Sequence, residues 1–171
     1  PATPPATTPT TNSTLPRITP PPITDSNIKN LVNEYINSNP NNYKAIGTWD
    51  VSQVTNMSDL FIDKVNFNED ISNWDVSKVT NMESMFRGTS IASQFDQPIG
   101  NWDVSKVTNM SKMFEHAGDF NHDISSWDTS RVTDMSYMFF YAVSFNQDIS
   151  EKTVTKTDGL EYTAWDVSSV T

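Results

Sequence analysis

A nine-residue stretch, "WDVSKVTNM", occurs at residues 74–82 and again, letter for letter, at 102–110. Related versions of it surround five tryptophans that are 25, 28, 25 and 38 residues apart: Trp49, Trp74, Trp102, Trp127 and Trp165. A repeat of this length is one structural unit that cannot bury its own apolar face, so neighbouring units have to stack on one another. The repeat therefore constrains the fold more than any other feature of the chain.

The segments inside each repeat predict its local structure. The short β-prone segments "DIS" and "WDV" predict two brief strands with a corner between them. The segment after them has apolar residues at helical spacing, which in the second repeat are Val79, Met82, Met85 and Phe86. Thr80 and Glu83 match a capping box at the start of this helix, and Gly88 and Gly118 lie where a C-terminal cap belongs. We therefore expect an α/β solenoid in which each repeat adds two short parallel-stacked strands and a short helix.

The chain divides into three regions. Residues 1–22 contain eight Pro and seven Thr and predict an extended tail or linker, because this composition cannot bury enough apolar surface to fold. Residues 23–48 hold a helical pattern at 24–38, with Thr24 or Asp25 as its cap, and lead into the first repeat. We expect this helix to close one end of the stack. Residues 49–171 hold the repeats, with an insertion at 151–163 and an open C-terminal end.

Composition excludes several classes of function. The chain has 11 Lys and Arg against 21 Asp and Glu, a formal net charge of −10, which argues against nucleic acid and an anionic membrane surface as partners. The absence of cysteine excludes a Cys-based zinc site, a thiol nucleophile and a disulfide framework. There is no run of about 18 apolar residues, so we expect no direct membrane insertion. The start at Pro1 and the end inside a repeat lead us to expect a mature or excised fragment.

The segments "FNQDIS", "WDVSKVTNMSKMF" and "ITDSNIKNLVN" resemble the bacterial surface lipoprotein repeat. This is a BspA-like, leucine-rich-repeat-type family found in surface proteins of bacteria, mycoplasmas and some protists and algae. The resemblance covers residues 23–171 and implies a leucine-rich-repeat-like solenoid at the cell surface, with a role in adhesion or matrix contact. It offers no catalytic residues, and the Pro/Thr-rich tail lies outside it.

Two polar positions recur beside the tryptophans. An aspartate follows each of them, which gives the column Asp50, Asp75, Asp103, Asp128 and Asp166. Because stacked carboxylates repel one another, each is expected to accept hydrogen bonds in an Asx turn or to bind Ca²⁺. One carboxylate per repeat supplies few of the oxygens that Ca²⁺ needs, which favours the turn. A second column, Asn56, Asn81 and Asn109, with Asp134 in the fourth repeat, is expected to satisfy free N–H groups.

Glycosylation is the alternative reading of the asparagines. "NMS" at Asn56 and Asn109 matches the acceptor pattern, but Asn81 does not, which favours a structural role for the column. The tail offers better candidates, Asn12 in "NST" for an N-linked glycan and Thr7, Thr8, Thr10 and Thr11 for O-linked sugars.

Other candidate sites have simpler structural readings. The tryptophans alternate with Ile and Val, so core packing is favoured over sugar stacking, and the methionines of the repeats are expected in the core as well. A metal site built from His116, Asp119 and His122 is conceivable, but the other repeats carry different residues there. We therefore expect no enzyme and no cofactor, with Ca²⁺ as the only candidate ion.

Two functions remain open. The first is an extracellular, non-catalytic module at the cell surface that serves adhesion or binds a protein or glycan. The second is a structural protomer of an extracellular filament, in which subunits contact copies of themselves head to tail and carry a glycosylated Pro/Thr-rich tail. Both place the chain outside the cell, and the sequence does not choose between them.

Overall fold

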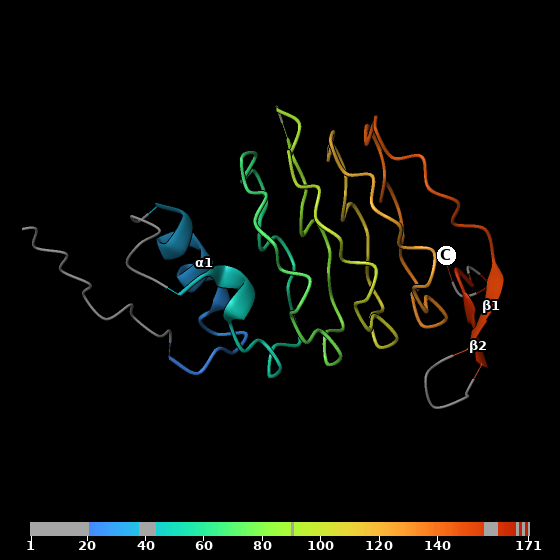
Figure 1. Ribbon diagram of the computed structural model, residues 1–171, viewed down its shortest axis with the longest axis horizontal. Helices are drawn as coiled ribbons and strands as arrows, with labels where there is room; N and C mark the ends of the chain where they lie inside the picture. The colour runs from blue at the N-terminus through green and yellow to red at the C-terminus, as the bar shows by residue number, and fades with distance from the viewer. Residues whose placement is uncertain are drawn as a thin grey trace, which may run out of the picture.

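The computed structural model describes residues 21–37, 44–89, 91–155, 161–166, 168 and 170. Its elements are helix α1 (Ile28–Asn37), the 3₁₀ turn η2 (Ile46–Thr48) and strands β1 (Lys152–Thr155) and β2 (Glu161–Ala164). From the start of η2 to residue 148, before β1, the chain forms four successive repeats of turns, with α1 at one end and the two strands at the other (Figure 1). We number them repeat 1 (46–70), repeat 2 (71–98), repeat 3 (99–123) and repeat 4 (124–148).

The predicted α/β, leucine-rich-repeat-like solenoid is wrong. Within the described ranges, α1 is the only α-helix, and the only sheet is the antiparallel pair of β1 and β2, in which Lys152 pairs with Ala164. The repeats hold neither the two parallel-stacked strands nor the helix that we expected. Among the described residues of the repeats, the only strand-like pairing consists of three isolated parallel bridges, Asn56 to Asn81, Asn81 to Asn109 and Asn109 to Asp134.

The helix predicted inside each repeat is absent because its backbone N–H groups are used between repeats. In repeat 2, Met82 N donates to Asn109 O at 2.9 Å, and Phe86 N donates to Met113 O at 3.0 Å. Between them, Ser84 N donates to Ser111 O of repeat 3 at 2.9 Å, whereas Met85 N donates three residues back, to Met82 O. A run of tight turns thus buries a side chain about every third residue, which is the spacing that we interpreted as helical. The segments "DIS" and "WDV" also form tight turns, in which Trp74 N donates to Ile71 O and Val79 N donates to Val76 O, so they form no strand.

The predicted capping residues have other partners. The hydroxyl and the N–H of Thr80 both donate to Thr55 O, at 3.2 and 2.8 Å, instead of capping a helix. Glu83 N donates to the side chain of Asn81 at 2.9 Å. Gly88 N donates to a carbonyl of repeat 3, and a Cβ on Gly88 would lie 2.5 Å from Ile91 O. Glycine is therefore required at position 88 because other backbone lies too close for a Cβ, and not because it caps a helix.

Two columns of phenylalanine run through the core. The first column is Phe61, Phe86, Phe114 and Phe139, with successive ring centroids 5.5, 5.7 and 5.6 Å apart. The second column is Phe67, Phe95, Phe120 and Phe145, with centroids 6.1, 6.1 and 5.9 Å apart. Within each repeat the two rings lie 3.8–4.2 Å apart and nearly parallel. The burial of these rings supplies an apolar contact between every pair of neighbouring repeats.

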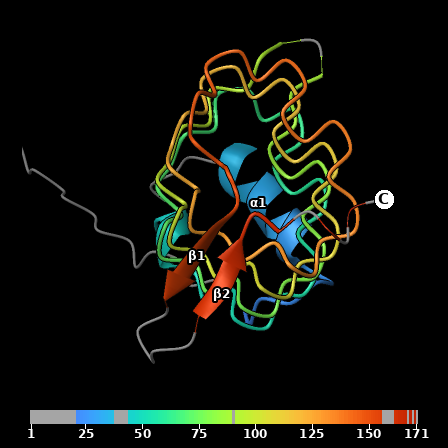
Figure 2. The same ribbon diagram turned by 90° about the vertical axis from the view of Figure 1, so that its right-hand side faces the viewer.

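Helix α1 lies across one end of the repeats, behind their outline in Figure 2. It begins at Ile28, not at residue 24, and its buried face consists of Ile28, Leu31, Val32 and Tyr35. The Tyr35 ring packs edge-on against Trp49 at 5.6 Å. The predicted cap residue Asp25 does not cap this helix. Its carboxylate instead accepts three hydrogen bonds from repeat 1, from the N–H and hydroxyl of Thr55 and from Asn56 N.

The insertion at 151–163 contains β1 and most of β2, which form the hairpin at the right of Figure 1. The hydroxyl of Tyr162 donates to Ser126 O and so attaches β2 to repeat 4. Burial, followed by the nearby carboxylates of Asp128 and Asp103, raises the pKa of Tyr162 above its usual 10.0. After β2 the repeat pattern resumes at Trp165, whose ring stacks on that of Trp127 at 6.3 Å.

Candidate functional site

The tryptophan column is part of the core. All five tryptophans are buried, with at most 5% of each side chain exposed. The indole N–H groups of four of them donate to the carbonyl of an isoleucine in the preceding repeat: Trp74 to Ile46, Trp102 to Ile71, Trp127 to Ile99 and Trp165 to Ile124. Trp49 donates to Lys44 O in the same way, at 3.3 Å. Rings held like this have no face free for a sugar.

The aspartate column forms Asx turns. Each carboxylate accepts the N–H of the serine two residues further on, at 2.8–3.2 Å, from Asp50 to Ser52 through Asp166 to Ser168. The aspartates of the "DIS" segments, which we did not single out, do the same at Asp70, Asp123 and Asp148. Hydrogen bonds from the serine hydroxyl and then from its N–H lower the pKa of Asp50, Asp70, Asp75 and Asp166. The repeated Asp-x-Ser signal is therefore a turn signal.

The asparagine column is held in the same manner. Asn56, Asn81 and Asn109 accept the N–H two residues on at 2.9 Å, and Asp134 does so at 2.8 Å. The amide nitrogen of Asn109 also lies 3.4 Å from Glu83 Oε2, which leaves it poorly placed to carry a glycan. The glycosylation candidates of the tail, Asn12, Thr7, Thr8, Thr10 and Thr11, lie outside the described residues.

The proposed histidine metal site is not assembled. The ring of His116 stacks on Tyr141 at 4.9 Å, whereas His122 Nε2 lies 3.1 Å from Asp96 O and 3.5 Å from its carboxylate. Among the residues that the structure describes, no three His, Asp or Glu side chains are grouped so that they could hold a metal ion. The same holds for the aspartate column and Ca²⁺. In the described part of the chain, no helix is long and apolar enough to cross a membrane.

A cluster of exposed aromatic rings on repeat 4 escaped the sequence analysis. We call Tyr137, Phe140 and Tyr141, which are 61%, 46% and 60% exposed, the exposed cluster. Tyr137 and Tyr141 both pack against Phe140, with ring centroids 5.6 and 4.4 Å away. His116 of repeat 3 extends the cluster by its contact with Tyr141. These rings break the repeat pattern, and this departure was the signal available in the sequence.

The backbone under the exposed cluster is strained. Tyr137 and Tyr141 have φ angles of 57° and 56°, in the left-handed region that bulky side chains rarely adopt. The turns impose this conformation, because Asp59, Ser84 and Lys112, which correspond to Tyr137 in the other repeats, also have positive φ. Glycine or asparagine would fit there at a lower conformational cost. Folding therefore does not account for two tyrosines at these positions.

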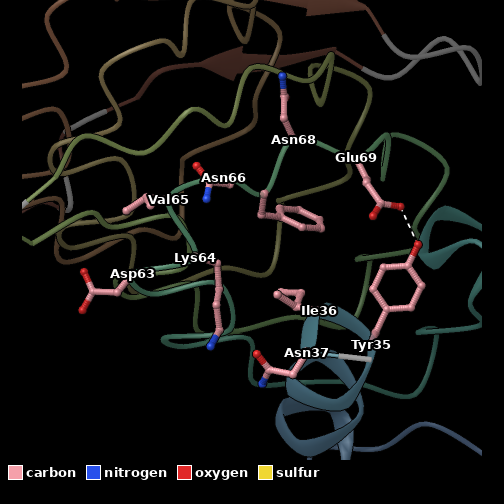
Figure 3. Close-up of a pocket in the computed structure, with 10 residues that line it drawn as sticks. Tyr35, Ile36, Asn37, Asp63, Lys64, Val65, Asn66, Asn68 and Glu69 are labelled. Carbon is pink, nitrogen blue, oxygen red and sulfur yellow. Dashed lines mark hydrogen bonds between the residues drawn. The ribbon is translucent and has the colours of Figure 1, made fainter. Parts of the chain in front are cut away.

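A pocket lies at the other end of the molecule, between α1 and the loop 63–69 of repeat 1 (Figure 3). Its volume is about 510 Å³, and its walls combine Tyr35, Ile36 and Asn37 of α1 with the loop residues. The hydroxyl of Tyr35 donates to Glu69 Oε2 at 2.5 Å across one side of this pocket. No sequence motif marks it, because its two walls come from segments far apart in the chain.

Comparison with known proteins gives one family. The family model described as "Mycoplasma protein of unknown function, DUF285" matches residues 26–152 and, in an overlapping placement, 89–171. The overlap shows that one model fits two stretches of the chain, as an internal repeat allows. No curated protein and no solved structure matches the chain.

Proposed function

The chain belongs to the family described as Mycoplasma protein of unknown function, DUF285, and from this premise we propose that it is a non-catalytic recognition module of the cell surface. Its partner is a protein or a glycan outside the cell. The location rests on the resemblance of the repeats to those of bacterial surface lipoproteins. It rests also on the composition of residues 1–22, which is typical of O-glycosylated stalks.

The exposed cluster is the observation that carries the proposal. Aromatic side chains, tyrosine above all, are enriched where proteins meet their partners, because each ring buries a large area at a small cost in side-chain entropy. Tyr137 and Tyr141 hold their rings outward on a backbone that would be more stable with glycine. A bulky residue held in a conformation that disfavours it supports a role in binding.

The geometry of the repeated polar residues supports a non-catalytic role. The carboxylates and amides of the repeats accept hydrogen bonds from the backbone of their own turns, as Asp75 does from Ser77 N at 3.0 Å. Hydrogen bonds lower the pKa of Asp75 and of several other aspartates, which makes them poor proton donors near neutral pH. The polar residues that recur in every repeat therefore have a structural role. We assign recognition to side chains that do not recur, such as those of the exposed cluster.

The test is a binding assay with the chain of residues 1–171 on arrays of immobilised extracellular-matrix proteins and glycans. The double variant Tyr137→Ser/Tyr141→Ser should lose the signal of any component that the wild type binds. The control is Ile91→Ser, which removes a side chain that is 66% exposed outside the exposed cluster and should bind as the wild type does. Equal binding by the double variant and the wild type would contradict the proposal.

The filament hypothesis remains a prediction with a defined obstacle. Helix α1 covers one end of the repeats, and Asp25 occupies the N–H and hydroxyl of Thr55 there. Head-to-tail stacking through that end requires α1 to move away. Electron microscopy over a range of protein concentrations tests the idea, and dispersed particles at every concentration would remove it.

A further inference from the structure

The pocket between α1 and repeat 1 has features of a small-molecule site that are separate from the exposed cluster. Its volume of about 510 Å³ lies within the range of about 300–1,000 Å³ that is usual for such sites. Ile36 lines it and lies between Lys64 and Tyr35 in Figure 3, and Phe67, which also lines it, is 6% exposed and stacks on Phe61 at 4.0 Å. The pocket therefore offers an apolar surface against which a flat ligand face can pack.

The polar groups of the pocket are mixed in kind. The amides of Asn37 and Asn66 both donate and accept hydrogen bonds, and Lys64 adds a cation near Asn37 in Figure 3. The hydrogen bond from Tyr35 orients the carboxylate of Glu69. The side-chain oxygen of Asn68 is not available, because it accepts Asp96 N and Gln97 Nε2 of repeat 2, at 2.9 and 2.7 Å.

The loop wall is fixed before any ligand arrives. Lys64 N donates to Phe61 O at 3.0 Å, and Phe67 N donates to Lys64 O at 2.8 Å. The neighbouring repeat adds two further bonds, from Asp63 N to Arg87 O and from Gln94 N to Val65 O. A wall held at four points loses little conformational entropy on binding, which favours affinity for a small ligand.

We propose that this pocket binds a neutral saccharide unit. A pyranose ring has an apolar face that suits the Ile36 wall, and each of its hydroxyls can both donate and accept, as the amides of Asn37 and Asn66 can. An anionic ligand is disfavoured, because Asp63 and Glu69 outnumber the single cation Lys64. The same two carboxylates would attract a cation, but Lys64 repels it and the bond from Tyr35 already engages Glu69.

The experiment is ligand-observed and protein-observed NMR on the chain of residues 1–171. The probes are the methyl glycosides of glucose, galactose, mannose and N-acetylglucosamine, with the methyl glycoside of N-acetylneuraminic acid and lysine methyl ester as charged probes. At least one neutral glycoside should shift the resonances of Asn37, Lys64 and Asn66. Asn66→Ala should weaken that binding by about tenfold or more, because the removed amide leaves ligand hydroxyls unpaired.

Two controls separate this site from the rest of the molecule. Asn73→Ala removes an exposed asparagine in repeat 2 and should bind the glycoside as the wild type does. The double variant Tyr137→Ser/Tyr141→Ser should also bind it unchanged, so failure of the pocket and failure of the exposed cluster give different results. The proposal is overturned if no neutral glycoside shifts the pocket resonances, if a charged probe binds in preference, or if Asn66→Ala binds as tightly as the wild type.

Discussion

The carboxylate of Asp25 supplies Thr55 with the hydrogen-bond acceptors that Thr80, Thr108 and Thr133, at the same position of later repeats, find in the preceding repeat. Oδ1 accepts the N–H of Thr55 at 2.7 Å, and Oδ2 accepts its hydroxyl at 2.6 Å. The later threonines, Thr80, Thr108 and Thr133, give both donors to the carbonyl of the threonine before them. The N-terminal segment thus completes the edge of repeat 1 with a side chain in place of backbone.

Asp25→Ala should lower the free energy of unfolding by about 1–2 kcal/mol, the usual effect of losing a capping side chain. The N–H of Thr55 should also exchange with solvent much faster. Urea denaturation and amide hydrogen exchange measure the two effects. Asp119→Asn, at an exposed aspartate outside this edge, is the control and should change neither. Unchanged exchange at Thr55 in Asp25→Ala would show that the hydrogen bonds contribute nothing.

The protein should lose stability in acid. The pKa lies below its ordinary value of 3.8 at Asp25, Asp50, Asp70, Asp75, Asp134 and Asp166. At Asp25 burial raises the pKa, but hydrogen bonds from Thr55 and Asn56 outweigh it. The unfolded chain therefore takes up protons at a higher pH than the folded chain does.

It follows that the stabilisation from these carboxylates is complete above pH 3.8 and is lost as the pH falls through the lowered folded values. The measurement is the free energy of unfolding from urea titrations at successive pH values. Asp75→Asn should flatten the acid limb, because one of the titrating groups is gone. An acid limb that is flat in the wild type would contradict the account of the turns.

Gly100 should tolerate no side chain. A Cβ there would lie 2.2 Å from Asp123 O of the next repeat, and one on Gly47 would lie 2.1 Å from Asp70 O. Gly100→Ala should therefore destabilise the protein by more than about 2 kcal/mol, because backbone has to move. The matched control is Ser125→Ala at the corresponding position of repeat 4, where we expect a change within about 0.5 kcal/mol. Thermal and urea unfolding of Gly100→Ala and Ser125→Ala measure the two changes in the free energy of unfolding.

Replacing a strained tyrosine of the exposed cluster should raise stability and weaken binding. Tyr137→Asn should raise the free energy of unfolding by about 0.5–1 kcal/mol, because asparagine adopts the left-handed conformation more readily. The same substitution should weaken the binding of any partner that recognises the exposed cluster. Denaturation and array binding are measured on one preparation. A variant that loses stability and keeps its binding would contradict both parts of this prediction.

Some of the fold follows from the sequence and some does not. The period of the repeat, the helix near the N-terminus and the Asx turns are all marked by local patterns such as Asp-x-Ser. The helix expected at 79–86 was wrong because Met82, Met85 and Phe86 have the same spacing in consecutive tight turns. What distinguishes the two conformations is the acceptor of Met82 N, which lies in another repeat at Asn109. A local pattern cannot report a partner that is distant in the chain.

The candidate sites were harder to predict for a related reason. The exposed cluster could have been noticed as a run of aromatics, because the other repeats carry Asp, Ser or Lys where repeat 4 has Tyr137, and Asp, Gly or His where it has Tyr141. The pocket between α1 and the loop 63–69 could not, because its walls meet only after folding. The role of Asp25 was hidden too, since its position before a helix predicts a cap and Thr55 is 30 residues away.

The repeated motif has a structural role, because its buried side chains and hydrogen bonds join each repeat to the next. A substitution of Trp102 tests this role most directly. Its ring is 4% exposed, and its indole N–H donates to Ile71 O at 3.3 Å. The measurement is the free energy of unfolding of Trp102→Ala by urea denaturation, with Lys106→Ala at an exposed position of the same repeat as control. The account predicts a loss of about 3–5 kcal/mol, since the substitution leaves a cavity between repeats. A loss below about 1 kcal/mol would contradict it and return the tryptophan column to the candidates for sugar binding.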